Sequence, residues 1–331
     1  MTNGSMHEII PRLFLGSSSA GASLENLQQS QITHVVSLGN FEPIHDSITY
    51  KIIHVLDVEE ENLIQYFNET FEFIDEARAA KQRVLVHCEA GVSRSTTIVA
   101  AYMMRKGKLD VQKTLDMIRD RRAFVAPNDG FLDQLELYHT LEYDVDPKHS
   151  AYRRFLVDSN AKEQQETGYI SNLALTPDPE VHRSTTSQKS IRCKKCRRRL
   201  VEVEHVLEHA PGKGQLAFSY TKRNGELNVT SAPTATMTTN QPLNPLLASL
   251  AASRMQCSSY FIEPMEWMGN LLDGEVEGRI DCPKCMSKLG QYNWAGAQCS
   301  CGRWITPAFM LHRKQVDEMR NQLPTTSSSR P

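Results

Sequence analysis

The eight cysteines of this 331-residue chain are divided very unevenly along it. Cys88 stands alone in the first half, and the other seven lie beyond residue 190: Cys193, Cys196, Cys257, Cys282, Cys285, Cys299 and Cys301. The chain begins without the long apolar stretch of a secretory signal, so metal ligation is a stronger interpretation of the cluster than a disulfide framework. The distribution predicts two units that use sulfur for two different purposes.

Composition narrows the class of protein. A hydrophobic fraction of 40% and a charged fraction of 23% are typical of a globular protein with an ordinary core. The formal net charge of −2 argues against a uniformly basic nucleic-acid coat. Because no run of 18 apolar residues occurs, we expect a soluble intracellular protein with no membrane partner.

The first 145 residues alternate between strand-like and helix-like segments. Short β-branched or apolar runs predict strands at residues 32–38, 51–56 and 83–87. Helical periodicity or a long apolar run predicts helices within residues 60–80, 96–104, 110–119 and 129–143. This alternation predicts an α/β domain over residues 1–145, with a central, mostly parallel sheet flanked by helices.

The remaining chain has a different organisation. Polar residues dominate 146–190, which we interpret as a linker that can include some helix. A small β-rich domain is predicted over 191–316, interrupted by a flexible insertion at 225–254 that is rich in Thr, Asn, Pro, Ala and Ser. Residues 317–331 are expected to form a C-terminal tail.

One segment, HCEAGVSRS at residues 87–95, suggests chemistry directly. Cys88 ends an apolar strand, and Arg94 follows six residues later where a helix begins. Backbone N–H groups of such a loop and the helix N-terminus can surround an anion, while an arginine fork grips two phosphate oxygens. The predicted phosphate-binding loop comprises Glu89, Ala90, Gly91, Val92, Ser93 and Arg94, and His87 is expected to support it.

The same surroundings would activate Cys88. Helix termini and cations lower a thiol pKa from about 8.5 to roughly 3.5–7.5, which makes the sulfur a nucleophile. Ser95, and alternatively Ser93, could donate a hydrogen bond to the sulfur as it departs in a second step. The alternative, a buried structural cysteine beside a surface arginine, is disfavoured because this loop also lies between an apolar strand and an apolar helix.

A leaving oxygen needs a proton, which a nearby carboxylic acid can supply. Asp57 follows the predicted strand at 51–56 and should emerge at the same sheet edge as the Cys88 loop. Glu59, Glu60 and Glu61 are close competitors, with Glu60 as the first alternative.

Residues 84–95, VLVHCEAGVSRS, resemble the signature of the dual-specificity branch of the protein tyrosine phosphatases, and the resemblance extends over about 140 residues. It implies that Cys88 is the nucleophile, Arg94 the phosphate ligand, Asp57 the general acid and Asn128 a loop-ordering residue. It also implies an enzyme that hydrolyses phosphotyrosine and phosphoserine or phosphothreonine through a phosphocysteine intermediate. A shallow pocket is expected because no tyrosine-recognition loop is evident.

The second cysteine group has the composition of two structural zinc sites. Seven cysteines and His209 supply eight ligands, enough for two closed tetrahedra that would support folding rather than catalysis. His205, Glu208 and His312 are alternatives to His209. Spacing leaves the pairing open: one arrangement puts Cys282, Cys285, Cys299 and Cys301 on one zinc, and the other joins the two CxxC pairs at Cys193 and Cys282.

This half of the chain resembles the zinc-binding domain of one group of atypical dual-specificity phosphatases, on three segments. They are CKKCRRRL from Cys193, SYFIEPMEWM from Ser259, and the stretch from Cys282 to Phe309. That resemblance implies action on pre-60S ribosomal particles, where the group promotes release of an assembly factor. An active phosphatase that also works in 60S maturation is our interpretation; the alternative is mainly an assembly factor with dispensable catalysis.

A dense basic run surrounds the first CxxC pair: Lys189, Arg192, Lys194, Lys195, Arg197, Arg198 and Arg199. It could contact rRNA phosphates, serve as a nuclear import signal, or be a solvated face of the metal site. With the resemblance, it predicts a protein of the cytoplasm and nucleus. The aromatic residues of this half are interpreted as core rather than as base-stacking platforms: Tyr260, Phe261, Trp267, Trp294 and Trp304.

Overall fold

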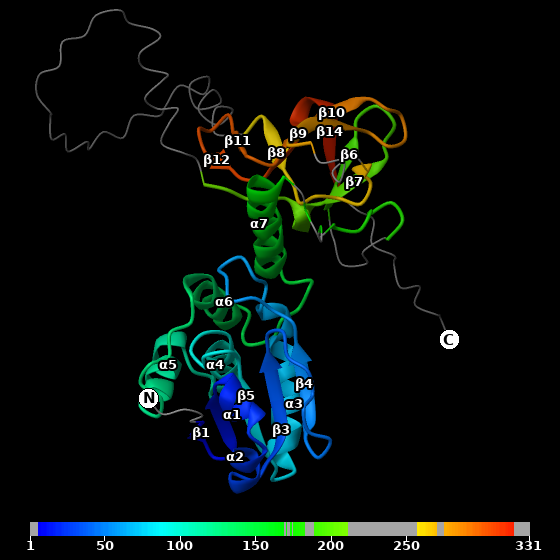
Figure 1. Ribbon diagram of the computed structural model, residues 1–331. Helices are drawn as coiled ribbons and strands as arrows, with labels where there is room; N and C mark the ends of the chain where they lie inside the picture. The colour runs from blue at the N-terminus through cyan, green and yellow to red at the C-terminus, as the bar shows by residue number, and fades with distance from the viewer. Residues whose placement is uncertain are drawn as a thin grey trace, which may run out of the picture. The chain divides into compact units, whose positions relative to one another are not determined.

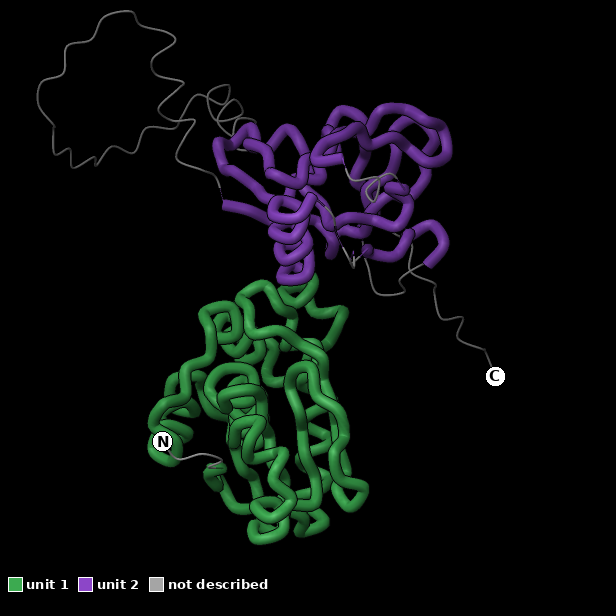
Figure 2. Tube along the Cα trace, in the orientation of Figure 1, with its two compact units in different colours: residues 1–153 green, residues 154–331 purple. Residues whose placement is uncertain are grey.

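The structure is a computed structural model that describes residues 6–168, 170, 173, 175–182, 189–210, 257–269 and 275–320. The chain divides into two compact units, residues 1–153 and 154–331, which are coloured separately in Figure 2. Within the described residues, no helix combines the length and hydropathy needed to cross a membrane.

Unit 1 is built around a five-stranded sheet with the order β1-β2-β5-β3-β4 (Figure 1). The strands are β1 (His7–Ile10), β2 (Leu13–Gly16), β3 (Ile32–Leu38), β4 (Thr49–Ile53) and β5 (Arg83–His87). Strands β2, β5, β3 and β4 are parallel, and β1 forms an antiparallel edge against β2. This confirms the predicted mostly parallel sheet, although the strand expected at 51–56 begins at Thr49 and ends at Ile53.

Helices cover this sheet on both faces. They are α1 (Ser18–Ala22), α2 (Leu24–Gln29), α3 (Phe67–Ala79, after a 3-10 turn at Ile64–Tyr66), α4 (Arg94–Gly107), α5 (Val111–Arg119) and α6 (Asp129–Thr140). Leu85 of β5 packs with Leu27 of α2 in one core cluster. Its neighbours Val84 and Val86 point to the other face, because successive strand residues alternate, and α3 and α4 also contact β5. These four side chains are fully buried, as a parallel sheet covered on both faces requires.

Unit 2 contains three small antiparallel sheets. A four-stranded sheet has the order β8-β13-β10-β9, a three-stranded sheet β14-β6-β7, and a ribbon β11-β12. The strands are β6 (Lys189–Cys193), β7 (Arg199–Glu202), β8 (Ser259–Phe261), β9 (Glu277–Asp281), β10 (Lys288–Asn293), β11 (Ala297–Gln298), β12 (Trp304–Ile305), β13 (Ala308–His312) and β14 (Val316–Arg320), with 3-10 turns at Val203–His205 and Arg313–Gln315. The prediction of a small β-rich domain in this half is confirmed.

The boundaries of unit 2 differ from the sequence prediction. Helix α7 (Ser150–Thr167) occupies much of the predicted linker, and its residue Ala161 is buried in the core of unit 2. The predicted tail is wrong for residues 317–320, because β14 pairs with β6 from Val316↔Cys193 to Arg320↔Lys189. The predicted insertion at 225–254 and the rest of the tail lie outside the described residues.

The core of unit 2 contains most of the predicted aromatic residues. Trp294 and Phe261 are almost completely buried, and Trp267 is half-buried and donates its Nε1–H to the Leu200 carbonyl at 2.7 Å. Tyr260 is partly buried against the same core. Trp304 was predicted wrongly, since 60% of it is exposed on the short ribbon strand β12.

Candidate active site and metal centres

The sequence-predicted catalytic residues meet at one edge of the unit 1 sheet. Cys88 directly follows β5, and Arg94 begins α4. Asp57 follows β4, and parallel strands bring their carboxyl ends to the same edge. Asn128 caps the N-terminus of α6, where its Oδ1 accepts the Phe131 N–H at 2.9 Å.

Hydrogen-bond donors outside the loop after Cys88 bind its backbone carbonyl oxygens and hold it in place. The Glu89 carbonyl accepts the Ser18 N–H at 3.0 Å, and the Val92 carbonyl accepts the Ala126 N–H at 3.0 Å. Between them, the Arg122 guanidinium donates to the carbonyls of Ala90 (3.2 Å) and Gly91 (2.9 Å). Because these peptides are planar and trans, outward carbonyls leave the following N–H groups directed into the loop, which forms an anion nest.

Gly91 is required by this curl. Its φ is +69°, and a Cβ there would lie 2.4 Å from the Gly16 carbonyl oxygen of β2. Any other residue would push the loop away from the sheet or strain its backbone. The predicted role of this glycine is therefore explained by a close backbone approach as well as by a positive φ.

Cys88 lies at the bottom of the nest with 1% of its surface exposed. The Ser95 hydroxyl is 3.1 Å from its sulfur, and the Gly91 N–H donates to the sulfur at 3.3 Å. Burial raises the pKa of the thiol, but hydrogen bonds from the Ser95 hydroxyl and from the loop N–H groups outweigh it and lower the pKa overall. These hydrogen bonds therefore stabilise the thiolate of Cys88 relative to its thiol.

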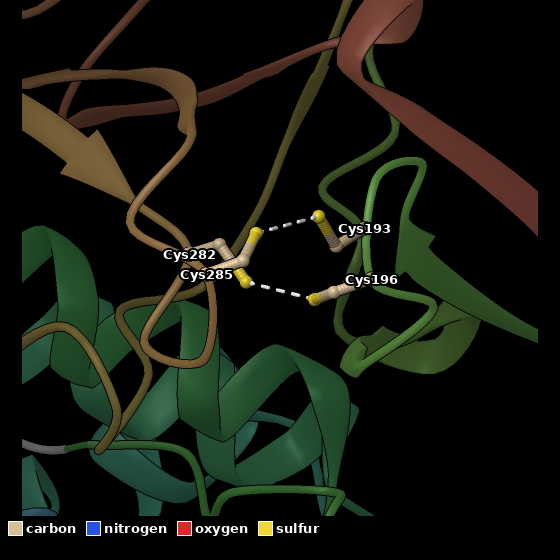
Figure 3. Close-up of side chains that lie close together, drawn as sticks. All are labelled: Cys193, Cys196, Cys282 and Cys285. Carbon is tan, nitrogen blue, oxygen red and sulfur yellow. Dashed lines mark hydrogen bonds between the residues drawn. The ribbon is translucent and has the colours of Figure 1, made fainter.

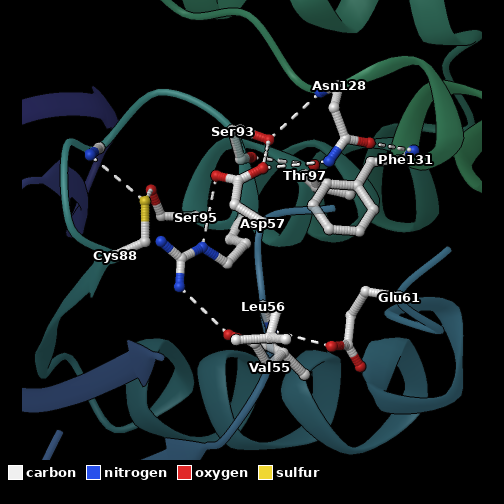
Figure 4. A network of polar contacts seen from close by, with 12 residues as sticks. Val55, Leu56, Asp57, Glu61, Cys88, Ser93, Ser95, Thr97, Asn128 and Phe131 are labelled. Atoms are coloured by element: carbon white, nitrogen blue, oxygen red, sulfur yellow. Dashed lines mark hydrogen bonds and ion pairs between the residues drawn. The ribbon is translucent and has the colours of Figure 1, made fainter. Parts of the chain in front are cut away.

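Asp57 and Arg94 belong to one polar network, which Figure 4 shows beside Cys88. Asp57 Oδ1 accepts the Ser93 hydroxyl at 2.7 Å and the Asn128 side-chain amide at 3.0 Å. Arg94 Nε lies 3.4 Å from Asp57 Oδ2, and its Nη1 donates to the Val55 carbonyl at 3.1 Å. The predicted phosphate ligand and the predicted acid are in direct contact.

The glutamates next to Asp57 are arranged differently. Glu59 and Glu60 are exposed, and neither has a described bond into the loop. Glu61 stabilises the turn, because its Oε2 accepts the Leu56 N–H at 2.8 Å. The geometry favours Asp57 over all three as the acidic group of the site.

Two buried residues of the site escaped the sequence reasoning. Gln134 accepts the N–H groups of Leu63 and Ile64, each at 2.8 Å, and donates to the Glu61 carbonyl, so it fixes the segment after Asp57. Arg122 lies in an RDRR run that reads as a charged surface, yet it is only 2% exposed. Nothing in the run distinguishes it from Arg121, which is exposed.

His87, which was predicted to support the loop, is the buried last residue of β5, directly before Cys88. It is 4% exposed, its Nε2 lies 2.8 Å from the Ser37 hydroxyl of β3, and burial lowers its pKa. Its ring leaves no room beside it, since a Cβ on Gly21 would lie 2.7 Å from the ring. The neutral imidazole therefore fills the space between the sheet and α1.

Unit 2 brings all eight predicted metal ligands into two groups of four. The first group joins the two CxxC pairs, Cys193, Cys196, Cys282 and Cys285 (Figure 3). Its sulfurs approach to 3.7 Å between Cys193 and Cys285 and to 3.5 Å between Cys196 and Cys282. A zinc tetrahedron with Zn–S bonds of about 2.3 Å has edges of about 3.8 Å, so the four sulfurs fit a metal ion.

The second group comprises His209, Cys257, Cys299 and Cys301. His209 Nε2 lies 3.3 Å from the Cys257 sulfur, so this nitrogen faces the shared centre. The alternative ligands are elsewhere: His205 pairs with Glu263 at 2.9 Å, His312 contacts the Ser259 hydroxyl at 3.1 Å, and Glu208 is exposed. Of the two pairings that spacing left open, the structure has the one that joins the CxxC pairs.

The basic run around Cys193 is largely paired within unit 2. Lys189 contacts Glu318 at 2.8 Å, Arg199 lies 3.7 Å from Glu202, Arg197 pairs with Asp317, and Arg198 pairs with Asp178. Lys194 and Lys195 are exposed at the tip of the first knuckle. Much of the run therefore stabilises unit 2, and the charge available to a nucleic acid is smaller than the sequence suggests.

A family model for the dual specificity phosphatase catalytic domain matches residues 13–140. Human "Dual specificity protein phosphatase 12" is 34% identical over 324 residues, which cover 96% of this chain and 89% of that protein. The chain belongs to the dual specificity phosphatase family. "Tyrosine-protein phosphatase YVH1" of Saccharomyces cerevisiae is 30% identical over 91% of this dual specificity phosphatase and 86% of its own length. The solved Yvh1 phosphatase domain from Chaetomium thermophilum is 27% identical, with a TM-score of 0.40, and covers 43% of this chain and 99% of that one.

As a dual specificity phosphatase, the chain is a hydrolase that acts on phosphoproteins. The matched catalytic domain includes the Cys88 loop, Asp57 and Asn128. The two relatives extend well beyond this match into unit 2, whose cysteine groups could hold metal ions.

Proposed function

We propose that the phosphatase reaction proceeds by attack of Cys88 on a phosphorylated tyrosine, serine or threonine, through a phosphocysteine intermediate. The observation that carries this proposal is the sulfur's place at the bottom of the nest, with the Gly91 N–H and the Ser95 hydroxyl 3.3 and 3.1 Å away. These donors stabilise negative charge on the sulfur, which makes it nucleophilic without an adjacent base.

In the first step, the Cys88 sulfur forms a bond to phosphorus as the bond from phosphorus to the substrate oxygen breaks. The loop N–H groups and the Arg94 fork hold the phosphoryl oxygens through the transition state. Asp57 gives its proton to the departing oxygen, so the product leaves as a neutral alcohol or phenol. Ser93 and Asn128 position the Asp57 carboxyl group for this transfer.

In the second step, water attacks phosphorus and gives a proton to the Asp57 carboxylate. The phosphorus–sulfur bond breaks, and inorganic phosphate and the Cys88 thiolate are regenerated. Ser95 lies on the sulfur side of the loop and donates a hydrogen bond to the departing thiolate. The cycle consumes one water molecule and returns Asp57 to its starting protonation state.

The two ligand groups of unit 2 are best suited to zinc. Four thiolates in one group, and three thiolates with one imidazole in the other, are the donors of structural zinc sites. When bound, zinc would crosslink strands that are far apart in sequence and leave no open position for substrate. His209 Nδ1 is buried without a hydrogen-bond partner among the described residues, so the ring is oriented by its other nitrogen, Nε2, which faces the Cys257 sulfur.

Replacement of the nucleophile tests the enzymatic proposal. Cys88→Ser should reduce hydrolysis of an aryl phosphate by at least about 10⁴-fold, because the hydroxyl is a far weaker nucleophile at neutral pH. Its melting temperature and metal content should match those of the unmodified protein. Retained turnover would place the nucleophile elsewhere.

We further propose that the protein acts in 60S ribosomal subunit maturation, in the cytoplasm and nucleus. The support is the resemblance of unit 2 to that group of atypical phosphatases, together with closed ligand sets that suit binding rather than chemistry. Pre-60S particles would be its partner. The paired basic run makes a protein component of the particle a better contact for unit 2 than extended rRNA.

A sedimentation profile of ribosomal subunits tests this role in cells whose only copy is Cys88→Ser. A 60S deficit with stable, metal-loaded protein would place dephosphorylation on the assembly pathway. A normal 60S:40S ratio would support the alternative, in which unit 2 is the working part and catalysis is dispensable. A normal ratio in cells that lack the whole protein would refute both versions.

A further inference from the structure

We propose that Arg122 is a positioning residue that sets the direction of the loop N–H groups toward Cys88 and places a buried positive charge beneath the loop. The inference rests on the proposed role of Cys88 as nucleophile. Arg122 lies after α5, outside the Cys88–Arg94 segment, and its described bonds to the loop end on backbone carbonyl oxygens.

Two bonds from one guanidinium reach two successive peptide units. Arg122 Nη2 donates to the Ala90 carbonyl at 3.2 Å, and Nε donates to the Gly91 carbonyl at 2.9 Å. Because the fork is planar and rigid, it fixes the relative orientation of the two carbonyls in a way that a single donor cannot. These bonds are made inside the protein, where Arg122 is 2% exposed.

The orientation of each carbonyl determines the next N–H. In a trans peptide the C=O and N–H bonds point in opposite directions, so holding the Ala90 oxygen turns the Gly91 N–H inward. That N–H is the donor found 3.3 Å from the Cys88 sulfur. Holding the Gly91 oxygen does the same for the Val92 N–H, and both N–H groups lower the pKa of Cys88.

Arg122 is itself held in place. Its Nη1 donates to His7 Nδ1 at 2.8 Å, and its guanidinium stacks 4.4 Å from the centre of the Phe124 ring. Burial, and then the Arg122 charge, lower the pKa of His7, so this ring is a neutral acceptor. The guanidinium also packs closely against the loop, since a Cβ on Gly91 would lie 2.7 Å from Arg122 Nη2.

The other charged and titratable groups of the site belong to different elements. Arg94 begins α4, Asp57 follows β4, and His87 ends β5 with its pKa lowered by burial. None of them contacts the Ala90 or Gly91 carbonyls in the described hydrogen bonds. Loss of Arg122 should therefore change the Cys88 environment in a way that these groups do not compensate.

The experiment measures how the rate of Cys88 alkylation by iodoacetate depends on pH, together with kcat and KM for an aryl phosphate, in the full-length protein. The variants are Arg122→Met, which removes the fork and the charge, and Arg122→Lys, which keeps the charge but can reach one carbonyl at most. Arg121→Met is the matched control, because this neighbour is exposed. Cooperative melting reports the folded fraction of each variant.

For Arg122→Met we expect the Cys88 pKa to rise by about one unit or more and kcat/KM per folded molecule to fall by about 10- to 100-fold. Arg122→Lys should fall between it and the unmodified protein, and Arg121→Met should behave as the unmodified protein. If Arg122→Met does not fold, the Arg122→Lys variant decides by a smaller rise of the Cys88 pKa.

An unchanged Cys88 pKa in a folded Arg122 variant, with activity lost only in proportion to the folded fraction, would overturn this inference and leave a merely structural arginine. The unmodified protein separates that failure from a failure of the proposed function. If its Cys88 alkylates with the pKa of an ordinary thiol, near about 8.5, the nucleophile assignment itself is wrong.

Discussion

The two units use cysteine sulfur in opposite ways. In unit 1, the described hydrogen-bond partners of the Cys88 sulfur are an N–H group and a hydroxyl group, and neither is another sulfur. In unit 2, sulfurs face one another at 3.5–3.7 Å across a shared centre. A thiolate that accepts hydrogen bonds from N–H and O–H groups can still attack an electrophile. Thiolates that converge on one point are instead suited to bind a metal ion, which blocks their reactivity.

The difference arises from the backbone on which each cysteine is placed. Cys88 lies between a parallel strand and a helix N-terminus, where orphan N–H groups converge. Cys193 ends β6 and Cys282 directly follows β9, and each begins a tight knuckle that presents two sulfurs on the same side. Reactivity is therefore decided by the loop type that follows the strand.

The largest effect is expected when one of the two metal sites of unit 2 loses a ligand. Cys282→Ser should remove one of two zinc ions per chain and abolish the cooperative melting of unit 2, because structural zinc supplies much of a small domain's folding free energy. Phosphatase kcat should change by less than about twofold, since unit 1 has its own core. Metal analysis, melting and an aryl phosphate assay measure these three quantities.

Cys257→Ser is the matched variant for the other ligand group, and it should also leave one zinc ion. Two metals retained in either variant would contradict the assignment of four ligands to each centre. A matching loss of phosphatase activity in both variants would show that the two units are not chemically independent.

A smaller effect is expected for the acid. Asp57→Asn keeps the shape of the side chain but removes its proton, so kcat should fall by about 10²- to 10⁴-fold for substrates with a poor leaving group. The decrease should shrink as the leaving group improves. Steady-state rates over a series of aryl phosphates measure this dependence.

Glu60→Gln is the control for this prediction, because Glu60 is an exposed neighbour in the same segment. It should leave the series unchanged. The reverse result, with Glu60→Gln slower than Asp57→Asn, would transfer the role of acid to Glu60.

The smallest effect concerns the support of Asp57. Asn128→Ala removes one hydrogen bond to Asp57 and the N-cap of α6, so kcat should fall by about 5- to 10-fold and the melting temperature should also decrease. Asn128→Asp keeps an acceptor for the Phe131 N–H but cannot donate to Asp57. If Asn128→Asp retains full activity, positioning of Asp57 by this residue is disproved.

The sequence was sufficient where one short segment determines local geometry. The apolar strand, Gly91 and the buried helix after Arg94 predict the nest, because each residue has a backbone requirement that is visible in the chain itself. The two groups of candidate metal ligands were also predictable in composition, since clustered CxxC cysteines most often bind metals, although His209 was only one of several candidates for the eighth ligand. The nest and each CxxC pair are formed by residues that are close neighbours in sequence.

The sequence was insufficient where partners come from distant segments. The ligand pairing depends on the approach of the knuckles after β6 and β9, about 90 residues apart. The role of Arg122 depends on carbonyls 31 and 32 residues away, and the polar strand β14 is recognisable only by its pairing with β6. The residue pattern within such a segment does not indicate which distant segment packs against it.

The most direct test of the contrast between the two units is a map of cysteine alkylation. The native, zinc-loaded protein would be treated with limiting iodoacetate at pH 6.5, and mass spectrometry would measure the modified fraction of each of the eight cysteines. The account predicts modification at Cys88, suppressed by inorganic phosphate, and protection of the seven cysteines of unit 2. Equal modification of Cys88 and the unit 2 cysteines, or protection of Cys88 alone, would contradict it.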